Sequence, residues 1–278
     1  MAVSAKEVNE LRKMTGAGMM DCKNALVEAN GDFDAAVVIL RKSGQKISAK
    51  RADRDANEGI VFAGTIDSGS DGFIFCMKCE TDFVAKNEEF HNLGKSILSE
   101  VLDKKPPTIE GLMALKLDGE DTIEEKITLL IGKIGEKIQI SNYYHLNGDR
   151  IIPYIHLGSK LGVLVSLKGV NGTDVQGAGR DVAMQIAAMN PLAVDKDAID
   201  QELIKKEFEI GKEQARAAGK PEELIEKIAQ GKLNKYFKEN TLLNQSFVKD
   251  PSLNVQKYLD SVSSGLTVSD FKRVSIGE

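Results

Sequence analysis

The sequence predicts an α+β protein built from a small helical domain, two related units of sheet and helix, and a helical hairpin. Three observations lead to this prediction. Apolar residues recur at helical spacing over residues 1–44 and again over 196–240. Between these segments, short apolar runs bounded by glycine-rich turns indicate strands. A strand–turn–strand segment near residue 72 returns in similar form near residue 162, which indicates an internal repeat.

The first 44 residues are predicted to form three short helices. Ser4 and Glu7 have the spacing of a capping box, in which each side chain bonds a backbone N–H at the start of the first helix. A second helix spans about residues 19–29, and Asp32 can cap a third, which is expected to stop at Gly44. Because three helices of this length bury only a very small core, the domain is expected to be held against something else.

Two units of sheet and helix are predicted to follow. The first contains a hairpin over residues 59–79, helices over 90–101 and 121–133, and a strand over 138–146. The second contains a hairpin over residues 151–168 and a helix over 182–189. Residues 72–78 (Gly-Phe-Ile-Phe-Cys-Met-Lys) align with residues 162–168 (Gly-Val-Leu-Val-Ser-Leu-Lys), so the units are expected to be related α+β subdomains.

Residues 196–240 are predicted to form an antiparallel helical hairpin. Apolar residues recur on one side of a long charged helix, Gly219-Lys220-Pro221 reverses the chain, and a second helix runs back. The segment has too few large apolar residues for a separate globular domain, so it is expected to project from the core. A short helix around residues 255–259 and a strand near 271–276 follow.

Composition narrows the classes of function. Hydrophobic residues make up 42% and charged residues 28% of the chain, the proportions of a soluble globular protein. The net charge of −5 and the aromatic content of 5% argue against nucleic-acid binding. The basic segment 45–58 is interpreted as a solvated linker, helical or not. No apolar run approaches the roughly 20 residues of a membrane helix, and with no signal peptide a cytoplasmic protein is expected.

No segment carries the residues of an enzyme active site. Gly94-Lys95-Ser96 resembles the end of a phosphate-binding loop, but Glu89 stands where that motif needs glycine, and the segment is predicted as helix interior. The histidines are scattered along the chain and do not indicate a metal site. We therefore expect neither catalysis nor a bound cofactor or metal.

Cys76 and Cys79 form a C-x-x-C pair. A zinc site would need two further ligands at similar spacing, and a redox pair usually lies at a helix N-terminus that lowers the thiol pKa. Here the pair is predicted to lie on a strand, where its odd spacing directs the two side chains to opposite faces. Buried thiols are the favoured interpretation, and a thiol oxidoreductase is the alternative.

Two groups of apolar residues have no obvious place in a core. Met19 and Met20 are adjacent at a helix start and cannot both face a core this small. Phe83 lies in residues 81–84 (Thr-Asp-Phe-Val), between the end of a strand and a polar helix start. Periodicity alone favours packing of Phe83 onto its own helix; the alternative is an exposed contact for another protein.

Several blocks of sequence carry a resemblance to a known family. They are residues 11–26 (LRKMTGAGMMDCKNAL) with 29–32 and 40–44, residues 79–86 (CETDFVAK), residues 133–136 (KIGE), residues 154–156 (YIH) with 162–165 (GVLV), and residues 219–221 (GKP). In this order they resemble the signatures of the bacterial elongation factor Ts family. The resemblance extends over essentially the whole chain.

The resemblance implies a fold that agrees with the elements predicted above. It consists of an N-terminal three-helix ubiquitin-associated-like domain, a two-subdomain α+β core with antiparallel sheets, and a protruding antiparallel coiled-coil hairpin. The predicted division is 1–55 for the helical domain and linker, 56–142 for the first core subdomain, 143–195 with 241–278 for the second, and 196–240 for the hairpin.

The resemblance also implies a guanine-nucleotide exchange factor that binds elongation factor Tu and promotes GDP release, so that GTP can bind. By resemblance, one turn enters the partner beside its Mg²⁺ and phosphate site, dislocates the Mg²⁺ and wedges Phe83 between helices. The residues expected in this turn are Thr81, Asp82, Phe83 and Val84. Further contacts with the GTPase domain are expected from Ile134, Gly135 and His156, and from Arg12, Met19, Met20 and Lys23.

Some questions stay open at the level of sequence. Contact with the GTPase domain and a further domain of elongation factor Tu is expected, without nucleic acid or membrane, and both a 1:1 and a 2:2 complex are compatible with it. The hairpin of residues 196–240 either mediates self-association or touches the partner's other domains. A ubiquitin-type scaffold that relies on residues 1–44 alone is the remaining alternative to an exchange factor.

Overall fold

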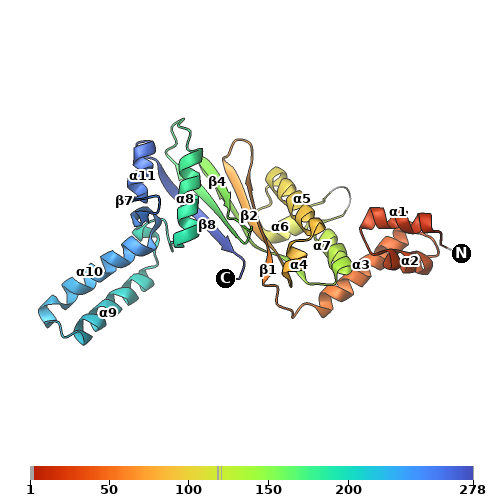
Figure 1. Cartoon of the computed structure of the whole chain (residues 1–278), viewed down its shortest axis with the longest axis horizontal. Helices are drawn as coiled ribbons and strands as arrows, with labels where there is room; N and C mark the ends of the chain where they lie inside the picture. Colours follow the sequence, from red (N-terminus) through yellow and green to blue (C-terminus); the bar gives the residue numbers. More distant parts are fainter. Residues whose placement is uncertain (1–2, 118, 120, 278) are drawn as a thin grey trace.

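A computed structural model shows an elongated molecule with an α+β core in the middle and a helical module at each end (Figure 1). The structure describes residues 3–117, 119 and 121–277. The core has four layers, in the order helices, sheet, sheet, helices, with separate groups of buried apolar residues between successive layers. Both of its three-stranded sheets are antiparallel, which confirms the predicted α+β class.

The N-terminal domain consists of α1 (Ala5–Thr15), α2 (Met19–Glu28) and α3 (Phe33–Lys50). The capping box of Ser4 and Glu7 is present, and the Asp32 carboxylate accepts the Ala35 N–H at 3.0 Å. The helices bury a small apolar core of their own, which Leu129 from a later helix completes. The N-terminal domain therefore packs against the remainder of the protein through Leu129, as its small size led us to expect.

The expected end of the third helix at Gly44 is wrong, because α3 continues through Gly44 to Lys50. Gly44 lies against α7 (Ile123–Ile134), where a Cβ atom on Gly44 would stand 2.4 Å from the carbonyl oxygen of Thr128. Gly132 of α7 faces Gly44 across this contact. The missing side chains let the two helices approach closely, and this packing offsets the roughly 1 kcal/mol that a glycine costs a helix.

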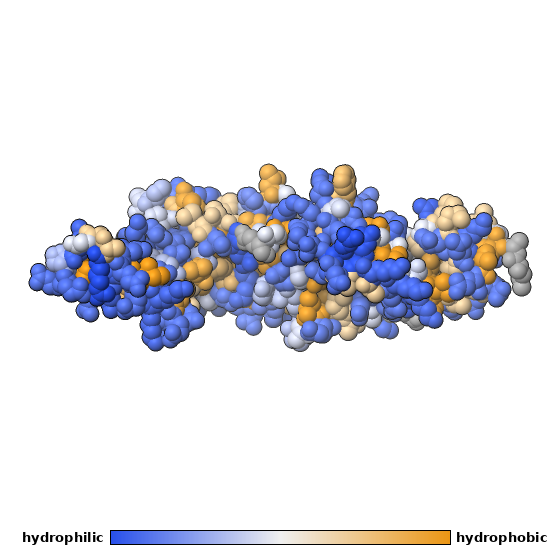
Figure 2. Space-filling view, turned by 90° about the horizontal axis from the view of Figure 1, so that it is seen from below, coloured by the Kyte–Doolittle hydropathy of each residue, from blue (hydrophilic) through white to orange (hydrophobic). Residues whose placement is uncertain are grey.

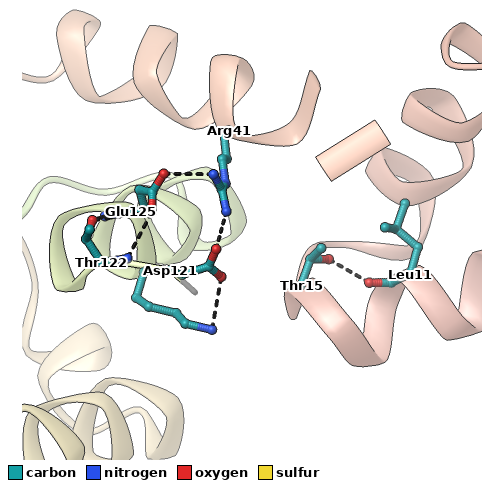
Figure 3. Close-up of polar contacts among 7 residues, drawn as sticks. Leu11, Thr15, Arg41, Asp121, Thr122 and Glu125 are labelled. Carbon is teal, nitrogen blue, oxygen red and sulfur yellow. Dashed lines mark hydrogen bonds and ion pairs between the residues drawn. The ribbon is translucent and has the colours of Figure 1, made fainter. Parts of the chain in front are cut away.

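Ion pairs flank the contact between α3 and α7 (Figure 3). The guanidinium of Arg41 on α3 donates to the carboxylates of Asp121 and Glu125, the latter at 2.7 Å. Glu125 also closes a capping box with Thr122 at the start of α7. Arg41 thus joins the N-terminal domain to the capped end of a core helix.

The first sheet has the strand order β1 (Glu58–Thr65), β2 (Asp71–Cys79), β3 (Ile138–Asn147). Three helices cover its outer face: α5 (Glu88–Lys104), α6 (Ile109–Met113) and α7. A one-turn helix, α4 (Asp82–Ala85), connects β2 to α5. The hairpin, the two longer helices and the third strand agree with the prediction; the two short helices were not anticipated by periodicity.

The second sheet has the order β4 (Arg150–Ile155), β5 (Leu161–Lys168), β8 (Thr267–Ser275), and α8 (Gln176–Met189) and α11 (Val255–Val262) cover it. In each sheet a third strand pairs beside the second strand of the hairpin, so the two units share a topology as well as the predicted hairpin and helix. The inner faces of the sheets pack on each other around Val61, Ile74 and Leu164. A Cβ atom on Gly162 would lie 2.6 Å from Val61 Cγ1, so the sheets are in close contact there.

An antiparallel helical hairpin of α9 (Gln201–Ala217) and α10 (Glu222–Asn240) projects from the opposite end (Figure 1). Gly211 brings the two helices together, since a Cβ atom there would lie 3.2 Å from Ala229 Cα. Short elements pack at its base: η1 (Lys196–Ala198), η2 (Leu242–Asn244), β6 (Ser246–Phe247) and β7 (Asp250–Asn254).

The two ends differ in surface character. In Figure 2 the helical hairpin is predominantly hydrophilic, whereas the N-terminal domain at the other end shows several hydrophobic residues. Within the described ranges, no helix is both long and apolar enough to cross a membrane.

Candidate functional site

Phe83 lies on the outside of α4, the single turn of helix that follows β2. It is 82% exposed, whereas its neighbours Val84 and Ala85 are each only 7% exposed and pack into the core. The packing of Phe83 onto its own helix, favoured by periodicity, is therefore wrong. A large aromatic ring stands in solvent on a turn whose next two residues are anchored, and Val84 acts as one of those anchors.

Thr81 caps the start of α4 and is held through each of its polar atoms. Its backbone N–H donates to Glu136 Oε2 at 3.1 Å, and its hydroxyl donates to Glu136 Oε1 at 2.9 Å. The hydroxyl oxygen accepts the Val84 N–H at 3.4 Å, and the Thr81 carbonyl accepts the Ala85 N–H at 3.2 Å. These bonds fix the direction in which α4 leaves the sheet.

Asp82 places a negative charge beside the exposed ring. Its carboxylate pairs with the ammonium group of Lys86, one helical turn later, at 2.7 Å. The hydrogen bond from Lys86 lowers the pKa of Asp82, and the charge of Lys160 acts in the same direction. Asp82 is therefore ionised at neutral pH, on the same turn as Phe83.

Ile134 and Gly135 adjoin the turn that carries Phe83. Ile134 is the last residue of α7, and Gly135 caps that helix with a φ of +78°, a conformation that favours glycine. The next residue is Glu136, which binds Thr81. The structure thus brings together two sequence-predicted contact segments that lie about 50 residues apart in the chain.

His156 lies on the turn between β4 and β5 and is exposed. Its Nδ1 atom lies 2.9 Å from the Tyr154 hydroxyl. In the same turn, the Ser159 carbonyl accepts the Val61 N–H of β1 at 2.8 Å, and Lys160 pairs with the carboxylate of Glu58 at 2.6 Å. This turn therefore lies beside β1. It is also close enough to the Phe83 turn for the charge of Lys160 to lower the pKa of Asp82.

The four predicted contact residues of the N-terminal domain are all exposed. Met19 and Met20 are 59% and 61% exposed, so neither belongs to the core of the domain. Together with Lys23 they line a groove between α1 and α2, and Arg12 lies on the surface of α1. The predicted residues thus form two regions, this groove and the turns of the core, which the contact of α3 with α7 joins.

Sequence reasoning missed the side chains that support the Phe83 turn and a prominent neighbour of His156. Glu80 and Glu136 lie within sequence blocks that carry the family resemblance, but no spacing indicates that Glu136 meets Thr81. Leu157, next to His156, is 95% exposed. The only feature of the sequence that could have indicated this exposure is the position of Leu157 just after a strand and before a glycine.

Cys76 and Cys79 are fully buried on opposite faces of β2, as predicted. Cys76 lies between the two sheets, and Cys79 lies on the face covered by helices. Burial raises the pKa of Cys76 to about 11 and that of Cys79 to about 12, with the charges of Glu136 and Glu58 adding to the latter. Protonated thiols on opposite faces of a strand are poorly placed for disulfide chemistry.

Both thiols are expected to resist alkylation in the folded protein. A pKa near 11 in place of 9.0 lowers the thiolate fraction at pH 8 about 100-fold, and burial slows the reaction further. The raised pKa favours the folded state below pH 9, and this advantage is lost as the pH rises through 11 and 12. Mass spectrometry after iodoacetamide treatment compares the alkylation rates of these thiols in folded and denatured protein. Equal rates in the two samples would contradict their interpretation as buried, protonated thiols.

The other motifs considered for chemistry have structural roles. Gly94 lies in α5, where a Cβ atom would stand 2.1 Å from the ring of Phe62, so this glycine makes room for an aromatic side chain rather than for a phosphate. Over residues 3–117, 119 and 121–277, no group of three or more His, Cys, Asp or Glu side chains is placed to hold a metal ion.

Comparison with known proteins gives one consistent result. A family model described as elongation factor TS matches residues 80–278. A protein of Amoebophilus asiaticus named elongation factor Ts is 54% identical over 100% of both chains. Proteins of the same name from Cytophaga hutchinsonii and Porphyromonas gingivalis are 53% and 50% identical, each over 99% of both chains. This chain belongs to the elongation factor Ts family of translation factors.

Proposed function

We propose that this protein is a guanine-nucleotide exchange factor, which binds elongation factor Tu with GDP in the cytoplasm and promotes release of the GDP. Membership of the family supports the partner. The observation that carries the mechanism is the exposed ring of Phe83 on a turn whose neighbouring residues are anchored in the core. The protein makes and breaks no covalent bond in this role, so it is not an enzyme in the chemical sense.

Exchange requires tighter binding to the nucleotide-free partner than to the GDP-bound one. By linkage, GDP affinity then falls by the same factor. A rigid apolar wedge suits this role because its burial is achieved only in a partner whose helices have moved. Burying one Phe stabilises that state by about 1.5–3 kcal/mol, or one to two orders of magnitude in affinity. We propose that other contacts supply the rest of the difference in binding free energy between the two states of the partner. They are those of Ile134, Gly135 and His156, and those of the N-terminal groove.

Asp82 is proposed to act on the partner's Mg²⁺. GTPases hold GDP through Mg²⁺ and through backbone amides around the phosphates. An ionised carboxylate brought beside this ion offers it a competing oxygen ligand, while Phe83 displaces the neighbouring helix. The turn of residues 81–84 would thus dislocate the Mg²⁺ and distort the phosphate site. The stoichiometry of the complex, 1:1 or 2:2, does not enter this mechanism.

The test is release of fluorescent GDP from elongation factor Tu, with and without this protein. Acceleration by about two orders of magnitude or more is expected, since the wedge alone accounts for one to two. Cys76→Ala/Cys79→Ala protein is expected to accelerate release as the wild type does, which separates exchange from thiol chemistry. Folded protein that leaves the release rate unchanged would rule out the proposed function.

A further inference from the structure

We infer that Glu136 is a positioning residue, which holds the Phe83 turn (residues 81–84) in its binding conformation before the partner arrives. The inference rests on the proposed function and goes beyond it. It assigns a role to a side chain on the α7–β3 connection, whose carboxylate reaches across to a turn that is distant in sequence.

The first step of the argument is the way in which the β2–β3 ladder ends. The last backbone pair is Cys79 with Ile138. Beyond it, the Thr81 N–H donates to the carboxylate of Glu136 at 3.1 Å, and the Lys137 N–H donates to the carboxylate of Glu80 at 2.6 Å. Side-chain carboxylates of residues just beyond the two strands thus replace the carbonyls that would continue the ladder. The backbone of Thr81 is satisfied without pairing, which lets the chain turn into α4.

The second step is the orientation of the Thr81 hydroxyl. A hydroxyl has one proton and two lone pairs. Because Glu136 accepts that proton at 2.9 Å, the lone pairs are available to the Val84 N–H, which is bonded at 3.4 Å. This is the N-cap interaction of α4. Glu136 therefore acts on Val84 through Thr81.

The third step is the effect on Phe83. An isolated single turn of helix is not stable in water, so α4 depends on its cap and on the burial of Val84 and Ala85. With the backbone on either side of it fixed, Phe83 is directed outward. A turn that is already ordered loses little conformational entropy when the partner covers it. Without Glu136, the backbone freedom of about one further residue would have to be lost at the interface, which we expect to lower exchange about tenfold.

The main experiment is a double-mutant cycle on the acceleration of GDP release. Glu136→Ala is expected to lower the acceleration about tenfold in the wild-type background and to have a much smaller effect in the Phe83→Ala background, where Asp82 is the remaining side chain of the turn with a role in exchange. A residue that touched the partner directly, or that only stabilised the fold, would lower exchange equally in both backgrounds. Additive effects would therefore overturn the inference.

Two variants of Thr81 and one of Glu136 make the test independent of a single substitution. Thr81→Ala is expected to match Glu136→Ala, and Thr81→Ser, which keeps the hydroxyl, is expected to lose less of the acceleration than Thr81→Ala. Glu136→Gln retains one acceptor oxygen and is expected to give an intermediate rate. Thr108→Ala is the matched control: Thr108 caps α6, a helix of similar length, with its hydroxyl 3.1 Å from the Gly111 N–H. It is expected to leave exchange unchanged.

A second readout needs no partner and so separates this inference from the proposed function. Hydrogen exchange at the Val84 and Ala85 amides of the free protein, measured by NMR, is expected to become at least about tenfold faster in Glu136→Ala than in the wild type. Unchanged protection of these amides would overturn the positioning role even if the wild type accelerates GDP release. Faster amide exchange would support it even if the partner assignment failed.

Discussion

Phe83→Ala is expected to reduce the acceleration of GDP release by about one to two orders of magnitude, because about 1.5–3 kcal/mol of apolar burial is lost from the complex. In the free protein the ring is 82% exposed, so its removal is expected to change the free energy of unfolding by no more than about 0.5 kcal/mol. A large functional loss with unchanged stability is the signature of a contact residue. Stopped-flow release of labelled GDP and urea unfolding measure the two quantities.

The matched control for Phe83→Ala is Val248→Ala. Val248 is 48% exposed, in the turn between β6 and β7 of the second subdomain, and no contact role is proposed for it. It is expected to leave the GDP-release rate as in the wild type. If Phe83→Ala protein accelerated GDP release as much as the wild type does, the wedge would be excluded as the source of exchange.

Gly44→Leu is expected to have the largest effect on the structure. A Cβ atom at this position would stand 2.4 Å from the Thr128 carbonyl oxygen and 3.1 Å from its methyl group, so α3 and α7 would have to separate. Overpacking of this kind typically costs about 1–3 kcal/mol of stability. Separation also displaces the groove of Met19 and Met20 from the turn of Phe83. The concentration of protein that gives half-maximal GDP release is therefore expected to rise about tenfold.

Gly231→Leu is the matched control for Gly44→Leu. Gly231 is also inside a helix, α10, but apart from its chain neighbours and the backbone of its own helix no atom lies within 4 Å of the position its Cβ would occupy. The substitution is expected to leave exchange unchanged and to stabilise the helix by up to about 1 kcal/mol. Similar losses in the two variants would show that removing a helical glycine, rather than the α3–α7 contact, is responsible.

Local features of the fold were predictable because their causes are local. The capping box of Ser4 and Glu7 depends on a spacing of three residues, and the opposite faces of Cys76 and Cys79 depend on the two-residue period of a strand. The end of α3 was misplaced because glycine stops helices in the absence of other contacts. The helix that packs on Gly44 lies about 80 residues further along the chain, and no local pattern announces it.

The candidate site was predictable only in part. Family resemblance supplied the proposed contact residues. Periodicity favoured packing of Phe83 onto its own helix, because a single turn is too short for an apolar period to be recognised. Glu136 could not be connected with Thr81 from the sequence, because their contact depends on the register of β2 against β3. Residues that touch a partner are recognisable as motifs, but residues that hold them in place are defined by tertiary structure.

The uninterrupted course of α3 has a mechanical consequence. Ala36 and Leu40 belong to the core of the N-terminal domain, and Gly44, on the same helix, contacts α7 of the central core. Because α3 runs without a break through both contacts, we expect a rotation of the N-terminal domain to move α7 as well. That helix ends at Ile134, two residues before Glu136 and its bonds to the Phe83 turn. When the partner binds and moves the N-terminal domain, we therefore expect the ring of Phe83 to be displaced as well.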